Sequence, residues 1–187
     1  MKTLSLFYEN FTSLSRFIQD NCEIFLNPNN SAILVQLFSS RCEQSFYKEL
    51  LHEIIELIPT AVIIGTTSSG VIKDGEVSGV DTVISFSIFQ KTNIRTAIYR
   101  KDVDEHKLGQ IIAKDMVTDR TKLLMMFTTS GNLNVSHLLH GIQSIRKALP
   151  MAGGVAGNAH LGKSFVFDNS EIEDLGVVCA VLESDDY

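Results

Sequence analysis

The sequence predicts a mixed α/β fold in which one unit of strands and helices occurs twice. Ile33–Ser40, a helical pattern and Pro59 recur about 91 positions later as Leu123–Ser130, a second helical pattern and Pro150. Short β-branched and aromatic runs alternate with amphipathic stripes, which favours parallel strands joined by crossovers; the later strands follow short turns, which favours antiparallel pairing. We therefore expect internally duplicated strand-helix-strand-helix-strand units that form a mixed sheet, or two packed sheets, flanked by helices.

The helices are predicted from apolar residues at helical spacing. The four stripes are Phe11, Leu14, Phe17, Ile18 and Cys22; Phe46, Tyr47, Leu50, Leu51, Ile54, Ile55 and Ile58; Leu108, Ile111, Ile112 and Met116; and Val135, Leu138, Leu139, Ile142, Ile145 and Leu149. Ser40 with Glu43 predicts a capping box before the second helix, and Asp102 with Glu105 predicts one before the third.

The strands are predicted where short apolar runs end at turn residues. Besides Leu4–Tyr8 and Ile33–Ser40, these runs are Ala61–Ile64, Val83–Phe89, Ile94–Tyr99, Leu123–Phe127, Ser164–Phe167 and Val177–Leu182. The composition of Asn27–Asn30 and Lys73–Gly75 predicts turns, and Gln90–Asn93 is expected to join the two halves.

The duplication predicts one domain over residues 1–187, built of the halves 1–90 and 93–187. Tyr8 corresponds to Tyr99, and the loop Gly65–Gly70 lies opposite Gly157–Gly162. Thr82–Phe89 lies opposite Gly176–Glu183. We expect Ile33–Pro59 and Leu123–Pro150 to superimpose about a pseudo-two-fold axis, because their apolar patterns match throughout.

Composition excludes several classes of protein. With 187 residues and 44% hydrophobic content the chain can bury a full core, and it has neither a membrane-length apolar stretch nor a signal-peptide pattern. We expect a cytoplasmic location, and the wide spacing of Cys22, Cys42 and Cys179 predicts neither a disulfide framework nor a metal knuckle. The net charge is −6 and no basic patch is present, which argues against nucleic-acid binding.

Two loops carry most of the candidate binding residues. Thr66, Thr67, Ser68 and Ser69 lie between two glycines after a buried strand, where backbone amides and hydroxyls can bind a small polar ligand; an ordinary turn with local hydrogen bonds explains them equally well. In the second half, Gly153, Gly154, Gly157 and Asn158 form the corresponding segment. So many glycines indicate the close approach of another backbone or a ligand rather than an exposed strand, and packing against the other half would explain them equally well.

Charged and imidazole side chains add few candidates. Arg41, between a strand and a helix, is read either as a clamp for a carboxylate or as a surface cation. His137 and His140 share a helix face without companion ligands, so no metal site is predicted. His160, in the second glycine loop, is left as a ligand donor or, alternatively, a haem ligand.

The Gly-Thr-Thr-Ser-Ser-Gly loop after Pro59, the segment Ala152–Asn158 and the strand Gly176–Leu182 together resemble the N-terminal FIST domain over about Ala32–Glu183. That resemblance implies a non-catalytic sensory domain that binds a small ligand such as an amino acid. It also implies a fused or partner output domain such as a histidine kinase, a diguanylate cyclase or a chemoreceptor. Some relatives bind haem and sense nitric oxide, which is the alternative, and a homodimer stays open.

The resemblance has two departures. Thr66 stands where relatives often have Cys, and Asn158 stands where many have Asp, so a carboxylate that recognises an amine would be missing. The ligand is expected where Thr66–Ser69 meets Gly154–His160, with Arg41 at the rim. No catalytic residues are predicted.

Overall fold

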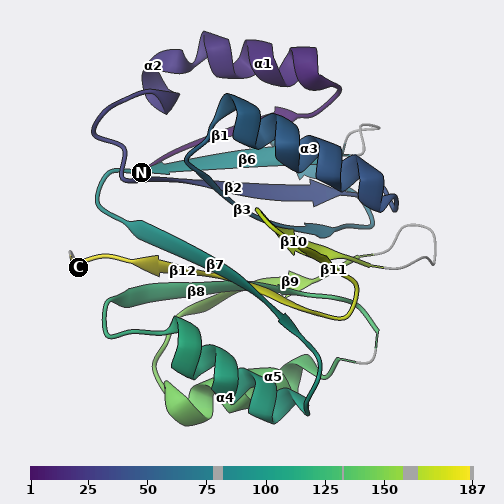
Figure 1. The fold of residues 1–187 in the computed structure, drawn as a ribbon, viewed down its shortest axis with the longest axis vertical. Coiled ribbons are helices and arrows are strands. Elements are labelled where there is room, and N and C mark those ends of the chain that lie inside the picture. The colour runs from purple at the N-terminus through teal and green to yellow at the C-terminus, as the bar shows by residue number, and fades with distance from the viewer. Residues whose placement is uncertain (78–81, 132, 158–163, 186–187) are drawn as a thin grey trace.

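The protein consists of two β-sheets packed face to face, with helices on both outer faces (Figure 1). The computed structural model describes residues 1–77, 82–131, 133–157 and 164–185. In these residues the first sheet has the strand order β1-β6-β2-β3-β10-β11 and the second has β7-β12-β8-β9. The predicted mixed α/β class is confirmed. The sequence left the number of sheets open, and the described residues form two large sheets and a small hairpin.

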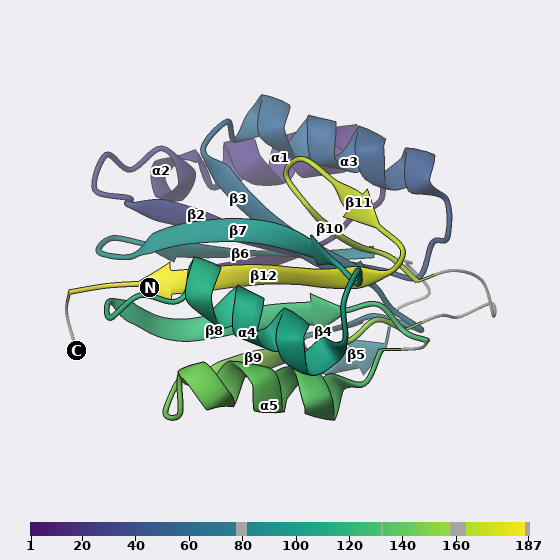
Figure 2. The same ribbon diagram turned by 60° about the horizontal axis from the view of Figure 1, so that its bottom comes forward.

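The elements of the first half are β1 (Lys2–Phe7), α1 (Phe11–Asp20), α2 (Cys22–Phe25), β2 (Ala32–Ser39), α3 (Gln44–Leu57), β3 (Ala61–Thr67), β4 (Ile72–Lys73), β5 (Glu76–Val77) and β6 (Thr82–Phe89). Those of the second half are β7 (Asn93–Arg100), α4 (Glu105–Met116), β8 (Thr121–Thr128), α5 (Val135–Ile145), β9 (Met151–Val155), β10 (Val166–Asp168), β11 (Ile172–Glu173) and β12 (Gly176–Glu183). The first-half helices cover one sheet, and α4 and α5 cover the other (Figures 1 and 2).

Strand pairing follows the connections between the strands. The strands joined through a helix, β2 with β3 and β8 with β9, are parallel. Every other pair in the described residues is antiparallel. This agrees with the expectation of parallel pairing through crossovers in the early part of each half and antiparallel pairing later, and the right-handedness of the crossovers stays a prediction.

The two halves have a common topology. The order β1-β6-β2-β3 in the first sheet has the same connectivity as β7-β12-β8-β9 in the second. Within it, Ile33–Pro59 and Leu123–Pro150 each contain a strand followed by a helix. Their superposition stays a prediction. The hairpins differ, because β10 and β11 of the second half extend the first sheet beside β3, whereas β4 and β5 form a small sheet of their own.

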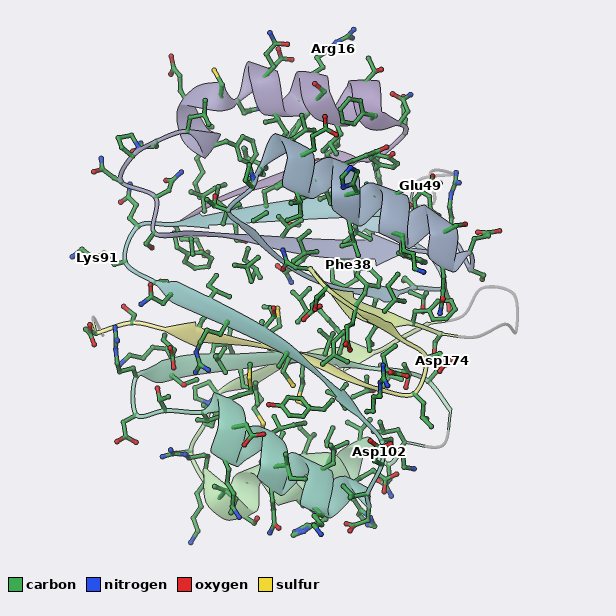
Figure 3. All side chains as sticks on the ribbon, viewed as in Figure 1. Arg16, Phe38, Glu49, Lys91, Asp102 and Asp174 are labelled. Carbon is green, nitrogen blue, oxygen red and sulfur yellow. The ribbon has the colours of Figure 1, made fainter. Side chains whose placement is uncertain are left out.

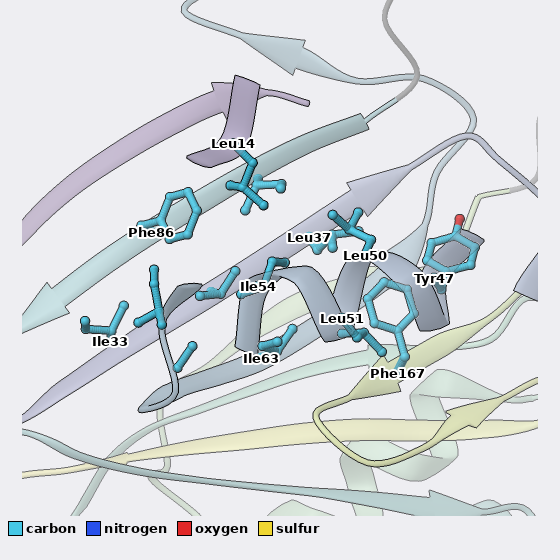
Figure 4. Close-up of a cluster of buried hydrophobic side chains, with 14 of the residues drawn as sticks. Leu14, Ile33, Leu37, Tyr47, Leu50, Leu51, Ile54, Ile63, Phe86 and Phe167 are labelled. Atoms are coloured by element: carbon cyan, nitrogen blue, oxygen red, sulfur yellow. The ribbon is translucent and has the colours of Figure 1, made fainter. Parts of the chain in front are cut away.

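Apolar side chains fill three layers. One cluster lies between α1, α3 and the first sheet, and includes the fully buried Tyr47, Phe86 and Phe167 (Figure 4). A second lies between α4, α5 and the second sheet. The third lies between the sheets, where the ring centroids of Phe38 and Phe127 are 5.3 Å apart (Figure 3). Each large side chain buried in this way contributes about 1.5–3 kcal/mol of transfer free energy.

Glycines permit the closest contacts of the fold. A Cβ at position 109 would lie 2.1 Å from the carbonyl oxygen of Leu138, and one at position 141 would lie 2.0 Å from that of His106. These two glycines therefore let α4 and α5 pack backbone against backbone, a contact that the apolar stripes did not reveal.

Several local predictions need correction. The capping box of Ser40 with Glu43 is wrong, because α3 begins after Glu43 and has no side-chain cap. That of Asp102 with Glu105 is also wrong, since Asp104 caps α4 by accepting from the amide of Lys107 at 3.0 Å. The turn at Lys73–Gly75 is confirmed, with Asp74 at φ 54° and Gly75 at φ 82°.

The glycine segment of the second half also differs from its prediction. Met151–Val155 forms the edge strand β9, although glycines had argued against an exposed strand. Gly153 has a φ of 147°, and a Cβ there would lie 1.7 Å from the carbonyl oxygen of Met126. The predicted close approach of another backbone is thus confirmed, because this strand lies against β8 so tightly that only glycine fits.

Candidate functional site

The two predicted loops meet at one end of the sandwich. The Gly157 amide donates to the Thr67 carbonyl at 2.9 Å, and a Cβ at position 157 would lie 2.4 Å from the amide nitrogen of Ser69. Here the chain leaving β3 and the chain leaving β9 cross in contact. Asn158 and His160 lie outside the described residues, so the structure shows only the first part of the second loop.

The hydroxyls of the first loop serve the fold itself. The Thr66 hydroxyl donates to the Phe165 carbonyl at 3.1 Å, and the Thr67 hydroxyl accepts from the Phe165 amide at 3.1 Å. The Ser68 hydroxyl donates to the Gly70 carbonyl at 2.5 Å. Thr66 and Thr67 are buried, and these bonds fix β10 beside β3. They therefore match the turn interpretation better than the ligand interpretation.

Arg41 lies on the α3 side of the first sheet. Its guanidinium carbon is 4.5 Å from the centroid of the Phe46 ring, and its carbonyl accepts from the Tyr47 hydroxyl at 2.6 Å. The side chain is exposed. This cation–π contact explains the position of Arg41 without a ligand.

A mostly apolar groove lies between α5 and β9, close to the predicted loops. Its volume is about 310 Å³. Gly153 and Gly154, which the sequence singled out, form part of its floor. The lining residues are Met126, Thr128, Val135, Leu139, Met151, Ala152, Gly153, Gly154 and Val155. Binding sites for small molecules are typically mostly apolar hollows of this size with a few polar groups.

Thr128 supplies the polar side chain of the groove. The residue is only 1% exposed, and its hydroxyl has no hydrogen-bond partner among the described residues. A buried hydroxyl without a partner costs free energy, so such a group in a native structure calls for an explanation. Sequence reasoning missed it. The available signal was its place at the end of β8, in the segment Thr128–Ser130 that precedes α5.

The backbone of β9 supplies further polar groups. The Pro150 carbonyl accepts from the Leu124 amide at 3.0 Å, and the Ala156 amide donates to the Thr128 backbone carbonyl at 2.7 Å. Because alternate residues of a parallel strand bond to the same neighbour, Met151, Gly153 and Val155 direct their amides and carbonyls to the outer edge. No strand pairs with that edge in the described part of the chain.

The wall formed by α5 is held in place from α4. Asn134 caps α5 by accepting from the His137 amide at 3.2 Å, and its own amide donates to the Glu105 carboxylate at 3.1 Å. Lys101 forms an ion pair with the same carboxylate at 2.6 Å. These contacts lower the pKa of Glu105 to about 2, with the Lys101 hydrogen bond as the largest cause. The groove is therefore preformed.

The histidines and cysteines that the structure describes add no chemistry to the groove. His137 and His140 are exposed on α5, and no group of three metal-ligating side chains occurs among the residues that the structure describes. Cys179 lies in the core, and burial raises the pKa of its thiol. The described groove lining thus holds one hydroxyl, backbone amides and carbonyls, and apolar side chains, and it contains no titratable side chain.

This arrangement defines an α/β domain with a small preformed pocket and no acid or base in the described pocket lining. The FIST N domain family matches residues 33–187, and the chain belongs to that family. The family comprises sensory domains of signal-transduction proteins. Among curated proteins none matches the sequence. No described helix has both the length and the apolar character needed to cross a bilayer.

Proposed function

We propose that this domain is the cytoplasmic input module of a signal-transduction protein and that it binds a small metabolite in the groove between α5 and β9. The observation that carries the proposal is the Thr128 hydroxyl, which is buried in an apolar pocket without a partner in the described residues. A ligand hydrogen bond would satisfy that hydroxyl. Gly153 and Gly154, which the sequence had placed at the site, line the same groove.

The lining favours a ligand with an apolar body and one polar end. Met126, Leu139 and Met151 offer polarizable and aliphatic surface. The polar end can bond to Thr128 and to the outward-facing backbone of Gly153. An amino acid with an aliphatic side chain has this chemistry, whereas Thr66, Thr67 and Arg41 are engaged elsewhere.

We also propose that the domain itself is not catalytic and that a fused or partner output domain carries the response. The support is the lack of any titratable side chain in the described groove lining. Haem binding through His160 is the alternative reading of the sequence. Absorption in the Soret region after haem addition would test it.

A thermal-shift screen with the twenty amino acids tests the proposal. A ligand that binds only the folded state raises the melting temperature by mass action. Val135→Trp should fill the groove and abolish the shift, because Val135 lines it at the first turn of α5. Ser136→Trp is the matched control, since Ser136 is the next residue along, is exposed and is not part of the lining. Equal shifts in both variants would contradict this site.

A further inference from the structure

The hairpin of β4 and β5 exposes its apolar side chains. Ile72 and Val77 are cross-strand partners and are 66% and 79% exposed. The two strands pair only with each other in the described residues. An isolated two-stranded hairpin is at best marginally stable in water, so this one gains by packing its apolar pair against another surface.

The second half shows where an equivalent hairpin packs. β10 and β11 lie between β9 and β12 in the sequence, as β4 and β5 lie between β3 and β6. β10 pairs antiparallel with the edge of β3, with Phe167 opposite Gly65, and Phe167 covers that end of the sheet beneath Tyr47. β10 belongs to the second half but pairs with β3 of the first half. If the first-half hairpin paired with the second half in the same way, β4 would lie on the edge of β9.

The sequence around the two hairpin turns supports this correspondence. Lys73-Asp74-Gly75 aligns with Phe167-Asp168-Asn169 at an offset of 94, which matches Asp74 with Asp168. Ile33 and Leu124 occupy equivalent sheet positions, pairing with Ala61 and Met151 respectively. On that basis Gly65 corresponds to Val155, and the partner expected for Val155 is Lys73.

The edge of β9 is suited to receive a strand. Met151–Val155 contains no charged residue, although charges and prolines commonly protect exposed edges. The other edge of the same sheet, β7, carries Arg95 and Arg100.

The root of the hairpin already touches the end of β9, through the Gly157–Thr67 hydrogen bond and the contact with Ser69. Lys73 lies four positions after Ser69 in the sequence, and four steps of extended chain can span up to about 14 Å. Lys73 can therefore reach Val155, which is only two residues from Gly157.

We propose that the β4–β5 hairpin is a lid that pairs antiparallel with β9 and closes the groove. In this structure the hairpin occupies its other position, where the Lys73 ammonium lies 5.5 Å from the centroid of the Phe7 ring. In the closed position Lys73 lies opposite Val155 and the hairpin covers the outer edge of the groove. What the lid encloses rests on the proposed function, whereas the movement itself does not.

Disulfide trapping tests the lid without any ligand. In a background with Cys22→Ser and Cys42→Ser, the pair Lys73→Cys and Val155→Cys should oxidise with glutathione disulfide, because antiparallel partners have Cα atoms about 5.5 Å apart. The matched control is Val77→Cys with Val155→Cys, since β5 would lie one strand further away. Intramolecular disulfides are mapped by mass spectrometry.

We expect the 73–155 disulfide to form at least ten times faster than the 77–155 disulfide. Equal rates, no disulfide, or only intermolecular disulfides would overturn the proposal. If the double-cysteine protein does not fold, Val155→Glu replaces it, and a zero-length carbodiimide should join the Lys73 amine to the new carboxylate. Absence of that amide in a folded Val155→Glu protein would equally overturn the proposal.

Discussion

Replacing Thr128 with valine should stabilise the ligand-free domain. Thr128 is 1% exposed, and its hydroxyl has no hydrogen-bond partner in the described residues. A buried hydroxyl left unpaired costs about 1–3 kcal/mol, and valine has nearly the same shape with a methyl group in place of the hydroxyl. Valine also suits a strand. We expect Thr128→Val to raise the free energy of unfolding by about 1 kcal/mol.

The adjacent residue provides a matched control with the opposite sign. The Thr129 hydroxyl is also buried, but it donates to the Gly176 carbonyl at 3.3 Å and accepts from the Gly176 amide at 3.0 Å. Thr129→Val leaves the Gly176 amide without that acceptor. We expect a loss of about 1–3 kcal/mol from the same chemical change one residue away.

Urea denaturation of the three proteins measures both effects, and thermal unfolding should show shifts of roughly 2–4 °C per kcal/mol for a chain of this size. The two variants should move in opposite directions from the wild type. A loss of more than about 0.5 kcal/mol in Thr128→Val would refute the reasoning, because the hydroxyl would then have a structural partner.

Three further outcomes follow from the packing, the charges and the histidines. Gly141→Ala should destabilise the domain by about 1–3 kcal/mol in a urea titration, because a Cβ there would lie 2.0 Å from the His106 carbonyl oxygen. The control is Gly70→Ala, where a Cβ would meet nothing within 4 Å, and it should change the stability by less than about 0.5 kcal/mol. The hydrogen bond from Arg95, with a further one from Thr118, lowers the pKa of Glu183. The ionised Glu183 carboxylate therefore stabilises the fold above the unfolded-state pKa of about 4.3, and this stabilisation is lost as pH falls through the lower folded value. The stability difference between wild type and Glu183→Gln should shrink below about pH 4, and a difference unchanged down to pH 2 would contradict this. Treatment with a chelator should leave the melting temperature unchanged if His137 and His140 hold no structural metal, and a fall of many degrees would reveal one.

The packing of helices on the sheets and the strand directions could be predicted because each rests on a local pattern, whereas the number of sheets could not. Apolar residues at helical spacing, such as Leu50, Leu51 and Ile54, predict the helix faces that pack on the sheets. Two apolar runs joined by a helix predict a parallel pair of strands. The destination of β10 could not be predicted, since a three-residue strand carries no signal of its distant partner. The edge strand β9 was missed because its glycines are required by the approach to Met126, a contact between separate strands.

The candidate site was predicted in part. The sequence indicated that the two loops meet, and it singled out Gly153 and Gly154, which line the groove. It could not show that the hydroxyls of Thr66 and Thr67 form hydrogen bonds with the backbone of Phe165, because that residue is almost 100 positions away in the sequence. It also could not single out Thr128, since a threonine at the end of a strand is ordinary until its burial and its lack of a described partner are known.

The central claim, that Thr128 and the groove bind a small ligand, is tested most directly by isothermal titration calorimetry of wild type and Thr128→Val with the amino acid that gives the largest thermal shift. The folded variant should bind this amino acid at least ten times more weakly than the wild type, which corresponds to about 1.4 kcal/mol of binding free energy. Equal dissociation constants for the two proteins would contradict it.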